Sequence, residues 1–364
     1  MAWGRACRAA ICAVAVATFA GLGTAVAAPQ WRVDGSASAI SGCFFQDVTH
    51  VPGTRILWTV GTCHAGSPIT DRHTPRLGWR QHPTGISGDL FSVTAARARD
   101  VWAVGTKNEQ PLAVHWDGKA WSEVATASLA PGTVGAEFSG VTAISSDDVW
   151  AVGWRDLPIN RQHTLVEHWD GDSWQIVPSP NWSKKYNQLL SIVPVPGHTN
   201  QLWAVGWRLT HHGATRPLVL RRRGTTWSVI RSLPRVAHGL LYGGAATGAP
   251  AGLWLVGVSY RASGRAEPLV FRRGRTGWRL VQAATLGAYS RSFNAATVIP
   301  GTTRLWAVGA GPLGGLVERW DGTTWARVPS PAGVGSLAAV TAISRRDAWA
   351  VGGNAAGTLV EHHH

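Results

Sequence analysis

The chain has 364 residues, with 34 Lys and Arg against 20 Asp and Glu and a formal net charge of +14. This length accommodates one large closed β architecture or two ordinary domains, and no Ser/Gly/Pro-rich linker interrupts the sequence. The positive balance favours acidic partners, such as anionic wall polymers, glycans or membrane surfaces. A genome that prefers Arg to Lys would produce the same balance, so this alternative stays open.

The first 27 residues predict a secretory signal segment. Arg5 and Arg8 form a basic start, residues 9–22 are apolar, and residues 25–27 form a small-residue cleavage site. The apolar run is shorter than the roughly 20 residues that span a membrane, so a transmembrane anchor is the weaker interpretation. We therefore expect residues 1–27 to be removed from a secreted protein, and residues 28–364 to form a single domain.

Two cysteines, Cys43 and Cys63, remain after that cleavage. An even cysteine count in an exported chain indicates a disulfide. Both lie ten residues from Gly53, the expected turn of a hairpin, so they would face each other across an antiparallel ladder. A free thiol or a metal site is the weaker alternative, because no metal-ligand spacing accompanies them.

One short phrase, as in Val101-Trp102-Ala103-Val104-Gly105, occurs seven times. Its tryptophans are separated by 43 to 53 residues, a period typical of propellers and solenoids. They are Trp58, Trp102, Trp150, Trp203, Trp254, Trp306 and Trp349.

The unit around Trp150 is the clearest of the seven. Its apolar runs alternate with turn residues, and Asp170-Gly171 is a tight-hairpin signal. No helical period persists. The unit therefore predicts an antiparallel meander of four strands, named a to d, over residues 141–144, 149–153, 164–169 and 173–177.

A second tryptophan opens strand d in six units. These residues are Trp79, Trp121, Trp174, Trp227, Trp278 and Trp325. The seventh unit stops at strand c, whereas residues 29–33 supply a spare strand d with Trp31. Pairing these two ends would close a ring and remove its exposed edge, which an open solenoid would not need. We therefore predict an all-β, seven-bladed β-propeller of four-stranded antiparallel blades, with large indoles filling the wedges between blades.

The pattern resembles kelch-type propellers. Val-Gly closes strand b, Trp116, Trp169 and Trp320 mark strand c, and Trp121, Trp174 and Trp325 open strand d. The chain departs from that family because only Gly352-Gly353 has the second glycine of the kelch doublet. It is still more similar to secreted bacterial propellers with D-V-W-A-V-G repeats, a group whose role is generally unassigned.

No catalytic residue, metal site or cofactor is predicted. The Asp117-Gly118 turn and its repeats look similar to the Asp-box of sialidase-like propellers, which is a folding element. Kelch-like copper oxidases need a cysteine at the metal, and here the two cysteines are explained by each other. The carboxylates of strand c (Glu167, Glu318, Glu361) and of the a–b turn (Asp100, Asp148, Asp347) recur at one position each, as structural residues do.

The residues that do not repeat point to a basic and aromatic surface on units three to five. Function commonly lies on loops that a rigid scaffold holds. The candidate ligand-binding residues are Trp154, Arg155, Trp182, Lys184, Lys185, Tyr186, Trp207, Arg208, His211, His212, Tyr260 and Arg261. Trp182 is expected to be exposed, whereas Trp154 and Trp207 either join this surface or cap the core.

We therefore expect a secreted, monomeric, non-catalytic binding module. Its partner would be an anionic cell-wall polymer, another glycan or an extracellular protein, and neither nucleic acid nor a membrane anchor is expected. One alternative is a carbohydrate-active hydrolase or lyase with its site at the central funnel. Another is a scaffold for extracellular assembly. Acidic residues converging on the funnel mouth would favour the enzyme.

Overall fold

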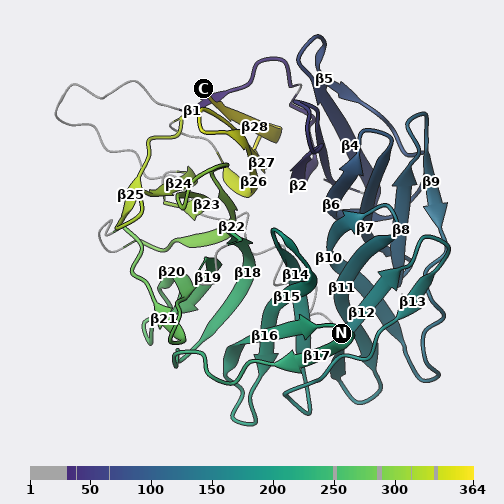
Figure 1. Ribbon diagram of the computed structural model, residues 1–364, viewed down its shortest axis with the longest axis vertical. Helices are drawn as coiled ribbons and strands as arrows, with labels where there is room; N and C mark the ends of the chain where they lie inside the picture. The colour runs from purple at the N-terminus through teal and green to yellow at the C-terminus, as the bar shows by residue number, and fades with distance from the viewer. Residues whose placement is uncertain are drawn as a thin grey trace.

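Seven four-stranded antiparallel sheets stand around a central axis as the blades of a β-propeller (Figure 1). The computed structural model describes residues 31–37, 39–64, 66–248, 252–284, 289–312, 314–331 and 335–364. These residues form strands and turns without a helix, and hence without one that could span a membrane. The predicted fold class is confirmed. The predicted signal segment, residues 1–27, lies outside the described residues and stays a prediction.

The blades are numbered one to seven in the order of their strand b tryptophans, and strand a of each blade lies nearest the axis. In the order a to d, the strands are β2 (Cys43–His50), β3 (Leu57–Cys63), β4 (Ser67–Thr74) and β5 (Gly78–Gln81) in blade one, and β6 (Asp89–Arg97), β7 (Asp100–Lys107), β8 (Gln110–Trp116) and β9 (Trp121–Val124) in blade two. They are β10 (Gly135–Ser145), β11 (Asp148–Leu157), β12 (Arg161–Trp169) and β13 (Trp174–Ile176) in blade three; β14 (Asn187–Val195), β15 (His198–Leu209), β16 (Thr215–Arg223) and β17 (Thr226–Val229) in blade four; and β18 (Gly239–Ala246), β19 (Leu253–Tyr260), β20 (Ala266–Arg273) and β21 (Trp278–Leu280) in blade five. They are β22 (Ser292–Val298), β23 (Leu305–Gly311), β24 (Gly314–Trp320) and β25 (Trp325–Arg327) in blade six, and β26 (Ser336–Ser344), β27 (Asp347–Asn354), β28 (Gly357–His363) and β1 (Trp31–Val33) in blade seven.

The ring closes as predicted. Strand β1 pairs antiparallel with β28, and Trp31 lies opposite His363, so the first described strand completes the last blade. Each strand b tryptophan meets the strand d tryptophan of the next blade, with ring centroids 5.2 to 6.0 Å apart and planes 66° to 90° to each other. Such edge-to-face pairs are favourable beyond their buried area. The seven pairs therefore join every blade to its neighbour, including Trp306 to Trp31 across the closure.

The glycine that ends each Trp-Val-Gly phrase is required by a close approach between strands a and b. A Cβ atom on any of these glycines would lie 1.9 to 2.0 Å from a carbonyl oxygen of strand a, which no real Cβ contact tolerates. The set is Gly61, Gly105, Gly153, Gly206, Gly257, Gly309 and Gly352. Directly after this contact, strand a of every blade carries a β-bulge.

Blades two, three and seven share a polar contact at the a–b turn. An aspartate two residues before the strand b tryptophan bonds Nε2 of a strand c histidine at 2.9 to 3.0 Å. The histidine ring lies against that tryptophan, with centroids 3.7 to 4.4 Å apart. The three groups are Asp100 with His115 and Trp102, Asp148 with His168 and Trp150, and Asp347 with His362 and Trp349.

The other four blades replace that histidine by arginine. The guanidinium groups of Arg72, Arg221, Arg272 and Arg319 lie 4.8 to 5.7 Å from the centres of the strand b tryptophan rings, as cation–π contacts. The aspartate position is Ile56, Gln201, Gly252 and Arg304 in these blades. The two positions therefore change together, and a histidine occurs where an aspartate can bond it.

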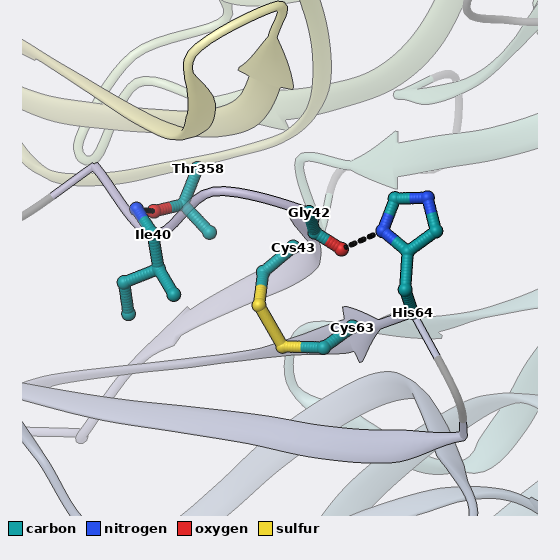
Figure 2. The surroundings of a disulfide bond; sticks show 6 residues. All are labelled: Ile40, Gly42, Cys43, Cys63, His64 and Thr358. Carbon is teal, nitrogen blue, oxygen red and sulfur yellow. Dashed lines mark hydrogen bonds between the residues drawn. A yellow bond between two sulfur atoms is a disulfide. The ribbon is translucent and has the colours of Figure 1, made fainter.

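A disulfide links the first two strands of blade one. Cys43 and Cys63 lie directly opposite each other in the ladder and are bonded, as the sequence predicts (Figure 2). Beside it, the Gly42 carbonyl accepts a hydrogen bond from Nδ1 of His64 (2.6 Å), and the Ile40 amide donates to Oγ1 of Thr358 (3.0 Å). These contacts fasten the crossing from blade seven to blade one.

We predict that Gly257→Ala destabilises the propeller. Its new Cβ would meet the Leu240 carbonyl oxygen at 2.0 Å, and the shift of strand a that relieves this overlap should cost about 3 kcal/mol. The free energy of unfolding in urea measures the effect. Gly274→Ala in the same blade is the control, because its nearest new contact is an ordinary 3.6 Å and the change should stay within about 0.5 kcal/mol. Equal stability of the two variants would contradict the close-approach argument.

Candidate functional site

The seven bulges project one side chain each toward the axis. All seven bulged residues line a central cavity of about 1040 Å³: Gln46, Phe91, Ser139, Leu190, Tyr242, Asn294 and Ala338. The cavity reaches the b–c turns of blades one and two, where His64, Asn108 and Glu109 line it, and we call this end the mouth. The seven blades share one backbone structure, but the bulged residues differ from blade to blade. The lining of the cavity is therefore asymmetric.

The chemistry of the cavity divides between its two sides. Blades one to four contribute acids and amides, namely Gln46, Asp47, Asp89, Glu109, Glu137 and Gln188. Blades five to seven contribute mostly apolar or small residues, such as Leu240, Tyr242, Gly243, Ala295 and Ala339. Among the described lining residues, none is Lys or Arg. A strongly basic protein therefore has an acidic centre, and acidic residues do converge on the funnel.

The Asp47 carboxylate forms hydrogen bonds that link neighbouring blades. Its carboxylate accepts hydrogen bonds from the Ser92 hydroxyl (2.7 Å) and the Val93 amide (3.0 Å) of the next blade. The Ser92 hydroxyl in turn accepts from the Val141 amide of blade three (3.2 Å). Burial raises the pKa of Asp47 to about 6, although these hydrogen bonds oppose the rise. Asp47 thus links three successive blades below the mouth.

Glu109 is held at the mouth by an uncommon backbone. It occupies the two-residue β7–β8 turn with Asn108, and its φ is +63°. Such turns need left-handed backbone at both positions and strongly prefer Gly at the second. A glutamate here therefore has a conformational cost, which is commonly found at functional positions. Its carbonyl accepts the Ala136 amide at 2.8 Å, which ties the turn to the start of β10 beside Glu137.

Trp154 and Trp207 form the aromatic wall of the cavity at blades three and four. Trp154 is only 5% exposed, whereas Trp207 is half-buried and stacks on Tyr186 with planes 18° apart. The Trp207 indole donates to Oε1 of Gln188 at 2.9 Å, and Nε2 of Gln188 donates to Oε1 of Gln162 at 2.7 Å. Both tryptophans therefore cap the strand ends and face the cavity at once.

Trp182 lies apart from this wall and corrects an expectation. It is half-buried against the core between blades three and four, not exposed. The guanidinium of Arg208 lies 3.9 Å from its ring centre and that of Arg231 lies 5.4 Å away. Buried Asn187 holds the loop by accepting the Trp182 and Ser183 amides. Desolvation, with a smaller contribution from the charges of Arg216 and Arg231, lowers the pKa of Arg208.

The remaining predicted residues are spread over the b–c face. Lys184, Lys185, His211 and His212 are exposed, and Arg155 is half-buried opposite His163. Tyr260 is 39% exposed, and Nε of Arg261 donates to Oε2 of Glu267 at 2.6 Å, an ion pair in which Arg265 shares the carboxylate. The structure thus separates the predicted surface into a cavity wall and several outer groups.

Several of the candidate ligand-binding residues of blades three to five lie on strands rather than on loops. β11 runs to Leu157 and β15 to Leu209, so Trp154, Arg155, Trp207 and Arg208 lie on strands rather than in loops. Tyr260 likewise ends β19. In blade three only residues 158–160 connect strands b and c. Longer strands hold these side chains more rigidly than loops would.

The sequence analysis did not identify two acids and one amide that line the cavity. Asp89, Glu137 and Gln188 lie two residues before the bulged residue of their strands. Each is paired with the strand b residue that directly follows the glycine of the Trp-Val-Gly phrase. Aligning the seven strand a segments on their buried Leu or Phe would have exposed this variable position. The bulge itself has no sequence signature here, so the alternation of inward and outward residues could not be followed across it.

The strand c glutamates are buried anchors for the connections between blades. Glu167 accepts the Ala127 amide (3.0 Å), Glu318 the Ala284 amide (2.9 Å) and Glu361 the Ser330 hydroxyl (2.9 Å). Asp71 occupies the same register position in blade one. Each of the four carboxylates also has one buried oxygen without a hydrogen-bond partner. Burial raises the pKa of the three glutamates to about 7 and that of Asp71 to about 6.

Comparison with solved structures shows a shared fold at low sequence identity. U3-55K aligns with a TM-score of 0.59 and 10% identity over 91% of this chain and 97% of its own. The BP39L lectin from Burkholderia pseudomallei aligns with a TM-score of 0.57 and 15% identity over 89% and 96%. The SapL1 lectin, solved with α-methyl fucoside, aligns with a TM-score of 0.50 and 12% identity over 82% and 100%.

No protein-family model matches the chain, and no curated protein matches it. The kelch resemblance therefore stays a prediction, and the class that the structure defines is the seven-bladed β-propeller. Within the described part of the chain, no group of three or more His, Cys, Asp or Glu residues is arranged to hold a metal ion.

We predict that the triple variant E167Q/E318Q/E361Q has a flatter stability profile with pH than the wild type. Because folding raises these pKa values from about 4.5 to about 7, the wild type loses stability as the pH rises from about 4.5 to about 7, where the unfolded chain releases protons that the folded protein keeps. Glutamine keeps the acceptor and cannot ionise. The melting temperature across this range measures the effect, with the exposed Glu123→Gln as control. A wild-type melting temperature that rises over this range in parallel with that of the triple variant would contradict the assignment.

Proposed function

We propose that the protein is a carbohydrate-binding module that holds a sugar at the mouth of its central cavity. The observation that carries this proposal is the combination of the aromatic wall (Trp154, Trp207) with carboxylates and amides (Asp89, Glu137, Gln188) around one opening. Aromatic rings stack on the apolar face of a sugar ring, and carboxylates accept hydrogen bonds from its hydroxyl groups. Two propellers of similar fold, BP39L and SapL1, are lectins, which supports this choice of ligand.

The charge of the cavity lining restricts the class of sugar that the cavity can bind. No described residue of the lining is Lys or Arg, so the lining offers no cation to an anionic sugar and better suits a neutral or amino sugar. The anionic ligand expected from the net charge would need another surface. We further propose that the protein is a monomer and that it acts outside the cell, a location that the Cys43–Cys63 disulfide supports. Assembly of extracellular partners remains an alternative for the outer faces of the blades.

We predict that Trp207→Ala lowers retention of the bound sugar by at least about tenfold, because it removes the accessible ring of the wall. An array of neutral, amino and acidic oligosaccharides identifies the ligand, and titration calorimetry measures the affinities. Trp182→Ala is the control, because it removes a similar ring outside the cavity.

Retention of neutral or amino sugars that depends on Trp207 supports the proposal. Absence of any retained sugar would contradict it. If Trp182→Ala lowers sugar retention and Trp207→Ala does not, the sugar binds at Trp182 and Arg208 rather than at the cavity.

A second candidate is a carbohydrate-active enzyme, and the convergence of Asp89, Glu109 and Glu137 on the cavity favours it. Hydrolysis of a glycosidic bond needs two carboxyl groups, one as acid and one as base or nucleophile. Glu137 accepts the Ser139 hydroxyl at 3.3 Å, and Glu109 lies in a backbone conformation that glutamate rarely adopts. Both features fit groups that are held in place for a reaction.

We predict for this candidate that E137Q abolishes release of reducing sugar from the oligosaccharide that the array identifies, while binding persists. The wild-type protein and E123Q, whose carboxylate lies on the outer surface, are the controls. A wild type that retains the sugar and releases no product would reject the enzyme and leave the binding module.

A further inference from the structure

A second, smaller cavity lies at the other end of the strands, on the side of the a–b turns of blades six and seven. Its volume is about 330 Å³, and its described lining consists of Ile299, Thr302, Thr303, Arg304, Arg319 and Arg345. Three elements supply it: the β22–β23 turn, strand β24 and the β26–β27 turn. Three arginines and two threonines meet there, without a carboxylate among the described lining residues.

The three arginines are held by neutral partners. Nη2 of Arg345 donates to the Gly301 carbonyl (3.0 Å) across the blade boundary, and Nε of Arg304 donates to the Asp321 carbonyl (3.2 Å). The guanidinium of Arg319 lies 5.4 Å from the centre of the Trp306 ring, and its Nε is buried without a hydrogen-bond partner. Each contact fixes an arginine in place, and each leaves its charge uncompensated.

The carboxylates of Asp321, whose carbonyl accepts from Arg304, and of Asp347 are hydrogen-bonded to other groups. Oδ1 of Asp321 accepts the amides of Thr323 and Thr324 within its own turn. Asp347, two residues after Arg345, bonds Arg55, Trp349 and His362. Neither carboxylate is among the residues that line the cavity.

The repeat shows how unusual this arrangement is. The positions of Arg304 and Arg319 in blade six are those of Asp347 and His362 in blade seven, where Oδ1 and Nε2 are 3.0 Å apart. In blade four they are Gln201 and Arg221, joined by a hydrogen bond of 3.0 Å. Blade six alone among the seven places two cations at this contact. Two adjacent like charges are unfavourable unless an anion neutralises them.

We propose that this cavity binds a tetrahedral oxyanion group, a phosphate or a sulfate, between Arg304, Arg319 and Arg345. Guanidinium groups offer paired donors that match the oxygen atoms of such groups, and charge-assisted hydrogen bonds of this kind are strong. Thr303 is exposed at the rim and adds a hydroxyl donor. The site lies on the face opposite the sugar cavity, so it gives the basic protein a separate contact for a phosphorylated or sulfated polymer. It does not depend on the sugar-binding proposal.

Titration calorimetry of the protein with inorganic phosphate, and separately with sulfate, tests the site. The wild type should bind at least one of them saturably at millimolar concentration. R304A/R345A should weaken binding at least about tenfold, since both side chains donate to the anion and both are exposed enough to leave the fold intact. R346A/R275A is the matched control, because it removes two exposed charges outside the cavity and should change the affinity less than about twofold.

Binding of phosphate alone would point to a phosphate ester, binding of sulfate alone to a sulfate ester, and either result supports the site. Two results would overturn it. One is the absence of saturable binding of both anions up to about 50 mM. The other is an equal loss of affinity in R304A/R345A and R346A/R275A, which would show attraction to the net charge of the protein rather than to this cavity.

Discussion

The contact between the strand b glycine and the strand a carbonyl is the constraint on which the rest of the structure depends. Because no Cβ fits between them, the two inner strands of every blade approach closely at one fixed point. The bulge that follows turns one side chain of each strand a toward the axis. The packing of the blades can therefore stay identical while the residues that line the centre vary freely. A repeated, rigid contact thus supports a unique, asymmetric cavity.

The two ends of the propeller use charge in opposite ways. The central cavity gathers acids from blades one to three, although the chain carries a net charge of +14. The small cavity at blades six and seven gathers arginines, by placing Arg304 where three other blades have an aspartate. Both features arise at positions where the repeat is broken. Such breaks separate the residues that recur for packing from the residues to which we assign ligand binding.

The architecture could be predicted because its main contacts follow from the spacing of residues in the sequence. The repeated tryptophans gave the number of blades, Trp31 indicated how the ring closes, and Cys43 and Cys63 lie at equal distances from a predicted turn. The site was less accessible. Asp89 and Glu137 reach the cavity only through a bulge, which depends on tertiary contact, and Trp182 is covered by two arginines that the sequence places far from it. The basic aromatic surface of blades three to five was therefore predicted as one surface, whereas strand direction divides it.

A crystal structure of the protein with the oligosaccharide that it retains would show where the sugar binds. We expect a sugar ring at the mouth of the central cavity, with its apolar face on Trp207 and its hydroxyl groups within hydrogen-bond distance of Glu137 or Gln188. A sugar bound on the outer faces of the blades, with the central cavity containing only water, would contradict this expectation.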